Sequence, residues 1–318
     1  MKKKLSIAIL LNNRKVPLWI FSSIEKLVNS NNAKVALVIN NKPTGSGAIK
    51  KYYGIGILLL KLIEKIDFMI FRKRNNYNLL KDILILEKHI TIYSQDTYPV
   101  DKNIAYRSLD ELFLKIHPDI IVKFGEHYLN KVLFDIPRYG IWTFSIETGK
   151  IPGGFDYGFW EVFRYRTISF STVEVIGCEE NRKVTIFESK ESTCPFSINK
   201  NRNNIFFRAS LFLPRLAESL QSYGEDYFQK QKQRYHNLDV DGRDNGISTA
   251  TGKVIRDAFK YAVRIIKLVI NKFFFTDAFS WQLLIKLDAE VNSLSCSFSS
   301  FIPLKSPKNV FWADPFVV

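Results

Sequence analysis

The chain has 318 residues, a length that predicts about two domains and allows a sizeable buried core. Hydrophobic residues make up 46% of it and charged residues 24%, which excludes a chain that is disordered throughout. The formal net charge of +15 fits an anionic ligand, an anionic surface or dispersed surface lysines. No zinc-finger, basic-zipper or RNA-recognition motif accompanies it, so we expect no specific nucleic-acid partner.

The cysteines and the first residues indicate the compartment. Three widely spaced cysteines without a C-x-x-C motif predict neither a structural zinc site nor a disulfide framework, which fits a reducing cytosol. The start "MKKKLSIAILLNN" has a basic end and an apolar run, but no small-residue cleavage site follows it, so it predicts a first β-strand. No uncharged apolar run is long enough to span a bilayer. We therefore expect a cytoplasmic protein.

The first elements predict a β-α-β unit. Residues 5–11 are continuously apolar and have the length of a buried strand. Pro17 opens a segment with helical spacing, and residues 33–40 form a second apolar run. Two such strands joined by a helix predict a parallel sheet with a right-handed crossover.

The pattern then repeats. Residues 54–74 predict an amphipathic helix and 89–94 a short strand, while 108–125 predict a helix followed by the buried strand "DIIVKFG". A further short strand, "IWTFSI", follows. We expect a doubly wound α/β domain with a mostly parallel sheet, whose ligands bind beyond the carboxyl ends of the strands. The loops after Phe124 and Ile146 lie at such ends.

The second half divides into four parts. Alternating strands between 167 and 198 predict a hairpin that completes, with a helix over 205–223, a domain of residues 1–222. Residues 223–252 are polar and predict a linker. Residues 253–275 predict a basic amphipathic helix, which either packs between modules or lies on an anionic bilayer as a peripheral membrane contact. Residues 276–318 predict the first strands of an incomplete β module.

Several segments together resemble a known family. The β-α-β start, "HPDIIVKFG", "IPRYGIWTFS" and "GKIPGGFDYGFWEVF" are similar to the formyltransferase domain that uses 10-formyltetrahydrofolate, found in methionyl-tRNA and sugar-nucleotide N-formyltransferases. The resemblance covers about residues 4–222 and implies a Rossmann-type fold, a folate cofactor and a small-molecule or sugar-nucleotide substrate. "FWADPFVV" resembles a box in the amino-terminal module of glucosamine inositolphosphorylceramide transferases. That likeness implies a β-propeller-like carboxyl-terminal module, missing here, and a role in cell-surface glycan assembly.

The same resemblance implies the catalytic positions, and all of them depart from the family pattern. The family Asn falls on Thr143, the family His on Ser145, and the family Asp near Glu179 or Glu180. Thr143 keeps one hydrogen-bond donor, whereas Ser145 cannot replace an imidazole in proton transfer. In a strand, Glu147 shares a face with Thr143 and Ser145 and is a substitute base. His127, in the loop after "VKFG", is a second substitute.

The predicted binding residues lie in two loops. Phe124 and Gly125 stand at the end of one strand, and Gly153 and Gly154 free the backbone for a close approach to a ligand. Tyr157 and its aromatic neighbours Phe155, Phe159 and Trp160 either stack on a flat ring such as a pterin or cap the core.

Three functions therefore remain open at the level of sequence, and one of them, a basic membrane-surface adaptor, rests on residues 253–275 alone. The first is formyl transfer to an amino group of a sugar nucleotide or related metabolite, with altered catalytic groups. The second is a catalytically inactive, formyltransferase-like module that binds a ligand for a glycan-assembly enzyme.

Overall fold

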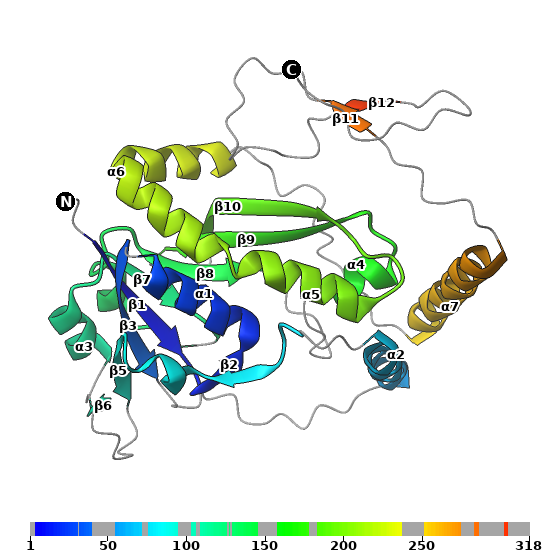
Figure 1. The fold of residues 1–318 in the computed structure, drawn as a ribbon, viewed down its shortest axis with the longest axis horizontal. Helices are drawn as coiled ribbons and strands as arrows, with labels where there is room; N and C mark the ends of the chain where they lie inside the picture. Colours follow the sequence, from blue (N-terminus) through cyan, green and yellow to red (C-terminus); the bar gives the residue numbers. More distant parts are fainter. Residues whose placement is uncertain are drawn as a thin grey trace.

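The computed structural model describes residues 4–30, 32–39, 55–71, 76–94, 103–105, 109–125, 127, 129–145, 158–177, 183–236, 251–274, 283–285 and 302–304. Within these residues the centre is an eight-stranded sheet in the order β10-β9-β8-β7-β1-β3-β5-β6 (Figure 1). The strands are β1 (Leu5–Leu11), β3 (Ala33–Ile39), β5 (Thr91–Ser94), β6 (Asn103–Ala105), β7 (Ile120–Lys123), β8 (Ile141–Ser145), β9 (Ile168–Ile176) and β10 (Lys183–Ser192).

The sheet is parallel from β6 to β8 and antiparallel at its other edge. β1 pairs in parallel with both β3 and β7, and β7 pairs in parallel with β8. The chain runs outward from β1 to β6 and then returns to β7 on the other side of β1, which is the switch point of a doubly wound fold. The predicted hairpin is β9–β10, which continues the sheet antiparallel to β8. The mostly parallel α/β fold predicted from the sequence is thus confirmed.

The central strands are apolar because both of their faces are covered. Ile7 and Ile9 of β1 face a cluster built with α1 (Leu18–Asn29), α5 (Ile198–Ala209) and α6 (Phe212–His236). Ala8 and Leu10 face the opposite cluster, which includes α3 (Leu109–Ile116) and the 3-10 turn η2 (Lys131–Phe134). All four of these β1 side chains are fully buried. A strand that is buried on both faces typically has a continuous run of hydrophobic residues, as residues 5–11 do.

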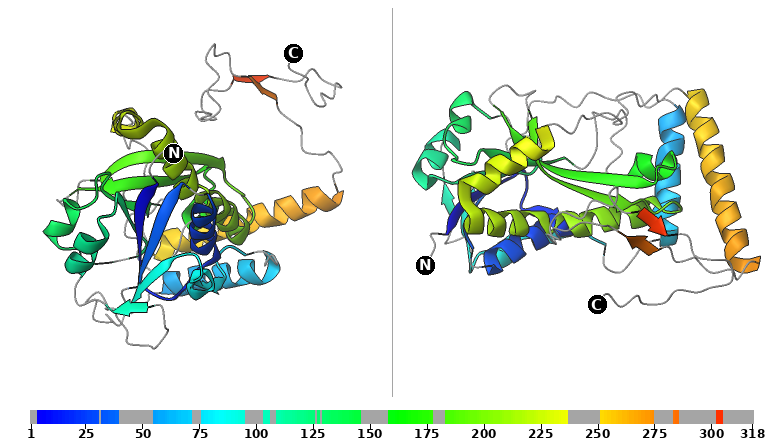
Figure 2. Two further views of the ribbon diagram at one scale, coloured as in Figure 1. Left: turned by 60° about the vertical axis from the view of Figure 1, so that its left-hand side comes forward. Right: turned by 90° about the horizontal axis from the view of Figure 1, so that it is seen from above.

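A third apolar cluster lies away from the sheet. It joins α2 (Ile55–Phe71), α4 (Phe159–Phe163) and α7 (Thr251–Phe274) through buried side chains such as Leu60, Phe159 and Tyr261. Figure 2 shows α2 and α7 side by side at one end of the molecule. The two amphipathic helices predicted over 54–74 and 253–275 are therefore present and pack on each other. None of the helices in the described part of the chain is long and apolar enough to cross a membrane.

Two small antiparallel pairs and a 3-10 turn complete the described elements. They are β2 (Lys15–Pro17) with β4 (Leu80–Asp82), β11 (Leu283–Ile285) with β12 (Ile302–Leu304), and η1 (Ile83–Leu86).

The region predicted as a linker is partly helical. α6 extends to His236 and passes through Gly224, whose backbone is non-helical with φ 67° and ψ −148°. Phe228 explains the extension, because its ring is buried against Tyr139 and Trp142. One apolar residue in a polar stretch was too weak a pattern to predict the helix. Residues 237–250 of the expected linker lie outside the described residues.

Candidate functional site

The carboxyl ends of β1, β7 and β8 meet at the switch point of the sheet. Lys123 pairs with Leu10 of β1 on one side and with Thr143 of β8 on the other. Ligands of doubly wound folds bind at this place because the loops there separate and leave a crevice. The carboxyl ends of β7 and β8, where the sequence predicts a ligand site, are neighbours in the structure (Figure 1).

Asn12, which follows β1, and Gly125, which follows β7, lie next to each other at the carboxyl ends of these strands. Gly125 is exposed and has a φ of +91°, a conformation that glycine adopts without strain. A Cβ atom at this position would lie 2.5 Å from the Asn12 Nδ2 atom, so a larger residue would displace the Asn12 side chain and would also strain the backbone. The backbone of Gly125 and the amide of Asn12 thus stand together at the edge. Sequence reasoning missed Asn12, although a polar residue directly after a buried strand is a usable signal.

Phe124 belongs to the core. Its ring is 5.0 Å from that of Phe144 and 5.5 Å from that of Trp19, centroid to centroid. Only 6% of Phe124 is exposed. Phe124 was predicted to bind the cofactor, but its ring is packed between these neighbours.

His127 is buried beside the same loop. Its Nε2 atom lies 3.1 Å from the carbonyl oxygen of Phe124, and the Lys123 ammonium donates to the carbonyl of His127 at 3.2 Å. Burial lowers the pKa of His127 to about 4, and the Lys123 charge acts in the same direction while the Phe124 hydrogen bond opposes it. The imidazole is therefore neutral at pH 7, and Nε2 carries the proton that Phe124 accepts. Such a ring is a weak base.

Thr143 lies on the face of the sheet that α3 covers, because Ile141 of the same strand belongs to that cluster. Directly across from it on β9 stands Glu174. Residues opposite each other on antiparallel strands share a face, so the hydroxyl and the carboxylate lie on the same side. Ser145 ends β8 in register with Thr172.

Glu174 is a candidate that the sequence analysis missed. It is 5% exposed; one carboxylate oxygen accepts from the Thr172 hydroxyl at 3.3 Å and the other lies 3.5 Å from the Lys183 ammonium. The sequence alternation of Val173 and Val175 with polar neighbours predicts that Glu174 faces solvent, so its burial was not predictable from that pattern. A carboxylate held in this way beside a hydroxyl can accept a proton from, or bind, an amine.

The remaining predicted positions divide in two. Phe159 and Trp160 are buried in the third cluster, so these aromatic residues cap the core, as one of the two interpretations had it. Glu147, Gly153, Gly154, Tyr157 and Glu180 lie outside the described residues.

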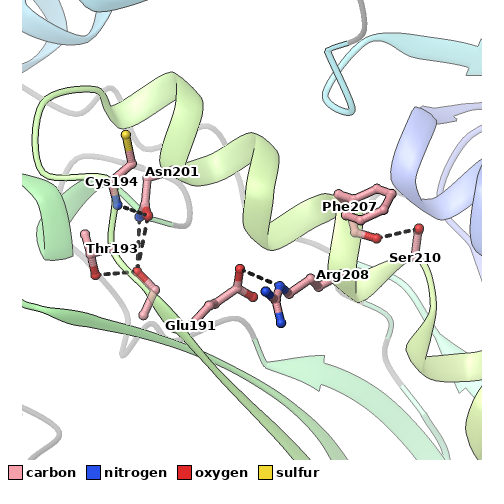
Figure 3. A network of polar contacts seen from close by, with 8 residues as sticks. Glu191, Thr193, Cys194, Asn201, Phe207, Arg208 and Ser210 are labelled. Atoms are coloured by element: carbon pink, nitrogen blue, oxygen red, sulfur yellow. Dashed lines mark hydrogen bonds and ion pairs between the residues drawn. The ribbon is translucent and has the colours of Figure 1, made fainter. Parts of the chain in front are cut away.

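Asn201 of α5 anchors Gly158, the residue that precedes α4. Its Nδ2 atom donates to the Gly158 carbonyl and the Ser169 hydroxyl, both at 3.1 Å. Its Oδ1 atom accepts from the Cys194 amide at 2.9 Å (Figure 3). Gly158 precedes α4 with a φ of +77°. One buried amide thus joins α4, β9 and α5. Nothing in the sequence pattern distinguished it from other asparagines on that helix.

Among the described residues, no three His, Cys, Asp or Glu side chains gather as a metal site would require.

Comparison with known proteins gives no family model and no curated protein that matches the chain. Among solved structures, glycinamide ribonucleotide transformylase 1 from Symbiobacterium toebii aligns at 10% identity over 69% of this chain and 88% of its own, with a TM-score of 0.41. A formyltetrahydrofolate deformylase from Pseudomonas syringae aligns at 12% identity over 71% of this chain and 62% of its own, with a TM-score of 0.44. A sugar N-formyltransferase from Shewanella aligns at 9% identity over 71% of this chain and 70% of its own, with a TM-score of 0.36.

These TM-scores lie below 0.5, and likeness at that level decides no function. The fold class stands on the sheet order of the chain itself. The β-propeller-like module expected from residue 276 finds no support in the comparisons.

Proposed function

We propose that this chain is a formyltransferase-like protein that binds a 10-formyltetrahydrofolate donor at the carboxyl ends of β7 and β8. The acceptor is an amino group of a sugar nucleotide or related metabolite, a class to which the formal charge of +15 is suited. The observation that carries the proposal is the pairing of Thr143 with Glu174. It puts a hydroxyl and a buried carboxylate at the strand position where the family resemblance implies the first catalytic residue.

The roles of these residues follow from their chemistry. When bound, the donor supplies an activated formyl group. The Thr143 hydroxyl would donate a hydrogen bond to the formyl oxygen of a bound donor. The Glu174 carboxylate would orient the attacking amine, accept its proton and return it to the donor nitrogen that releases the formyl group, taking the place of the imidazole that Ser145 cannot provide.

The strand ends beside the switch point leave room for the backbone to contact a ligand directly. Gly125 is exposed and carries no side chain that would block the approach, and the Asn12 amide stands next to it. We assign Gly125 and Asn12 to donor binding and leave the Phe124 ring to the core.

Binding without transfer is the second candidate, and His127 favours it. With a pKa of about 4, His127 is a poor proton acceptor at neutral pH, so it does not restore the base that the family pattern loses at Ser145. A module of this kind would hold the same ligand for another enzyme.

Calorimetric titration with 5-formyltetrahydrofolate, a stable analogue of the donor, tests the binding step. We expect micromolar affinity for the parent chain and tighter binding for Thr143→Asn/Ser145→His, which restores the family pair. Transfer of labelled formyl to amino sugars is then measured with Glu174→Gln, for which we expect a loss of about 100-fold or more in rate, as for a removed proton acceptor.

Ser192→Ala, an exposed position on β10, is the matched control and should change neither measurement. Absence of binding by both the parent chain and the double variant, in proteins shown to be folded, would contradict the folate proposal. Binding by both without transfer would support the second candidate.

A further inference from the structure

Helix α7 exposes an apolar stripe that does not take part in its packing. Ile255, Phe259, Ile266 and Ile270 recur four, seven and four residues apart and therefore lie on one side of the helix. Phe259 is 69% exposed. The residues that α7 buries against α2 and α4, including Val254 and Tyr261, lie on another side. The exposed stripe is thus separate from the side of α7 that packs on α2 and α4.

Helix α2 has a comparable stripe. Leu58, Leu62, Ile66 and Met69 recur four, four and three residues apart and are all exposed, whereas Leu60 is fully buried in the cluster shared with α7. The two helices lie side by side (Figure 2). Apolar stripes exposed on two neighbouring helices indicate an interaction surface, since surface hydrophobics on monomeric proteins are usually scattered.

Basic side chains flank the stripes. Arg256, Lys260 and Lys267 are exposed on α7 at spacings of four and seven, which places them on a third side of the helix. Lys61 and Lys65 are exposed on α2. We refer to the exposed apolar and basic residues of both helices together as the α2–α7 face.

We propose that the α2–α7 face binds the surface of an anionic lipid bilayer. Helices at such surfaces insert apolar side chains at the boundary between headgroups and acyl chains, while Lys and Arg contact anionic headgroups. A second copy of the chain fits less well, because docking two such faces would oppose two sets of basic side chains in a protein of formal charge +15.

Vesicle flotation tests the proposal with the full chain. We expect binding to mixed phosphatidylcholine–phosphatidylglycerol vesicles and little to phosphatidylcholine alone. Salt should weaken the binding, because raising it from about 0.15 M to about 1 M shortens the Debye length from about 8 Å to about 3 Å. Lys260→Gln/Lys267→Gln should lower the affinity by roughly fivefold for each basic residue removed.

The apolar stripe is tested separately. Phe259→Glu/Ile266→Glu should weaken binding by about tenfold or more, since both side chains would leave the interface. Ile85→Glu, a similarly exposed apolar residue on η1, is the matched control and should bind as the parent does. All variants are checked for folding by circular dichroism.

Three results would overturn the proposal. The first is no binding of the folded parent chain to anionic vesicles, and the second is equal binding by the parent and both double variants. The third is a dimer in vesicle-free solution that Phe259→Glu/Ile266→Glu dissociates, which would assign the face to a second copy of the chain.

Discussion

His127 is the residue whose ionisation the fold changes most clearly at the candidate site. Its pKa falls from 6.5 to about 4 on folding, so the unfolded chain binds a proton over a pH range in which the folded chain does not. Stability from this group is complete above pH 6.5 and is lost as the pH falls toward 4. The loss should be on the order of 2 kcal/mol.

His127→Gln removes this titration. The unfolding free energy of the parent minus that of the variant should therefore fall by about 2 kcal/mol when the pH is lowered from 7.5 to 4.5. The difference is the useful quantity because the buried Glu191 carboxyl, with a pKa raised to about 7 by burial and opposed by Arg208, shifts the stability of both proteins alike. Urea unfolding at several pH values measures it. A difference independent of pH would contradict the burial of the imidazole.

At the scale of elements, Asn201 holds three of them together. Asn201→Ala would leave the Gly158 carbonyl and the Cys194 amide without their partner in a buried place. An unsatisfied buried polar group costs about 1–3 kcal/mol, so we expect a loss of about 2–4 kcal/mol in the free energy of unfolding. Chemical denaturation with an unchanged slope would report it.

Asn204→Ala is the matched control for this change, because Asn204 is exposed on the same helix. It should alter stability by less than about 0.5 kcal/mol. Equal effects of the two substitutions would mean that the loss arises from the helix rather than from the Asn201 hydrogen bonds.

The elements also show how far the sequence predicts the fold. β1, β3, β7 and the β9–β10 hairpin were predictable because apolar runs and alternation are local signals. The extension of α6 was not, since its cause is the burial of Phe228 against residues some 90 positions earlier in the chain. The same limit applies to the site. The strand end near Thr143 followed from strand order, and Asn12 directly after β1 was a usable signal. The burial of Glu174 opposite Thr143 depends on the register of β8 and β9, which no local pattern contains.

At the scale of the whole molecule, the apolar interior is divided. Two clusters cover the faces of the sheet, where residues such as Ile7 and Ile121 are fully buried. The third cluster, between α2, α4 and α7, is smaller, and its two long helices keep large apolar side chains exposed. Regions with fewer buried contacts open locally at lower free energy than the core does. The helical layer should therefore open separately from the sheet.

Tyr261→Ala tests this separation without vesicles present. Tyr261 is 8% exposed and its ring lies 6.0 Å from that of Phe163, so its removal should cost about 3 kcal/mol of local stability. Hydrogen exchange should accelerate in α2, α4 and α7 while the amides of β1 and β7 keep the protection of the parent chain. Phe259→Ala, an exposed position on the same helix, should change the exchange rates of neither the helical amides nor the strand amides. If Tyr261→Ala accelerated exchange equally in the sheet, the layer and the sheet would form one cooperative unit, and membrane binding through the α2–α7 face would then be coupled directly to the stability of the candidate site.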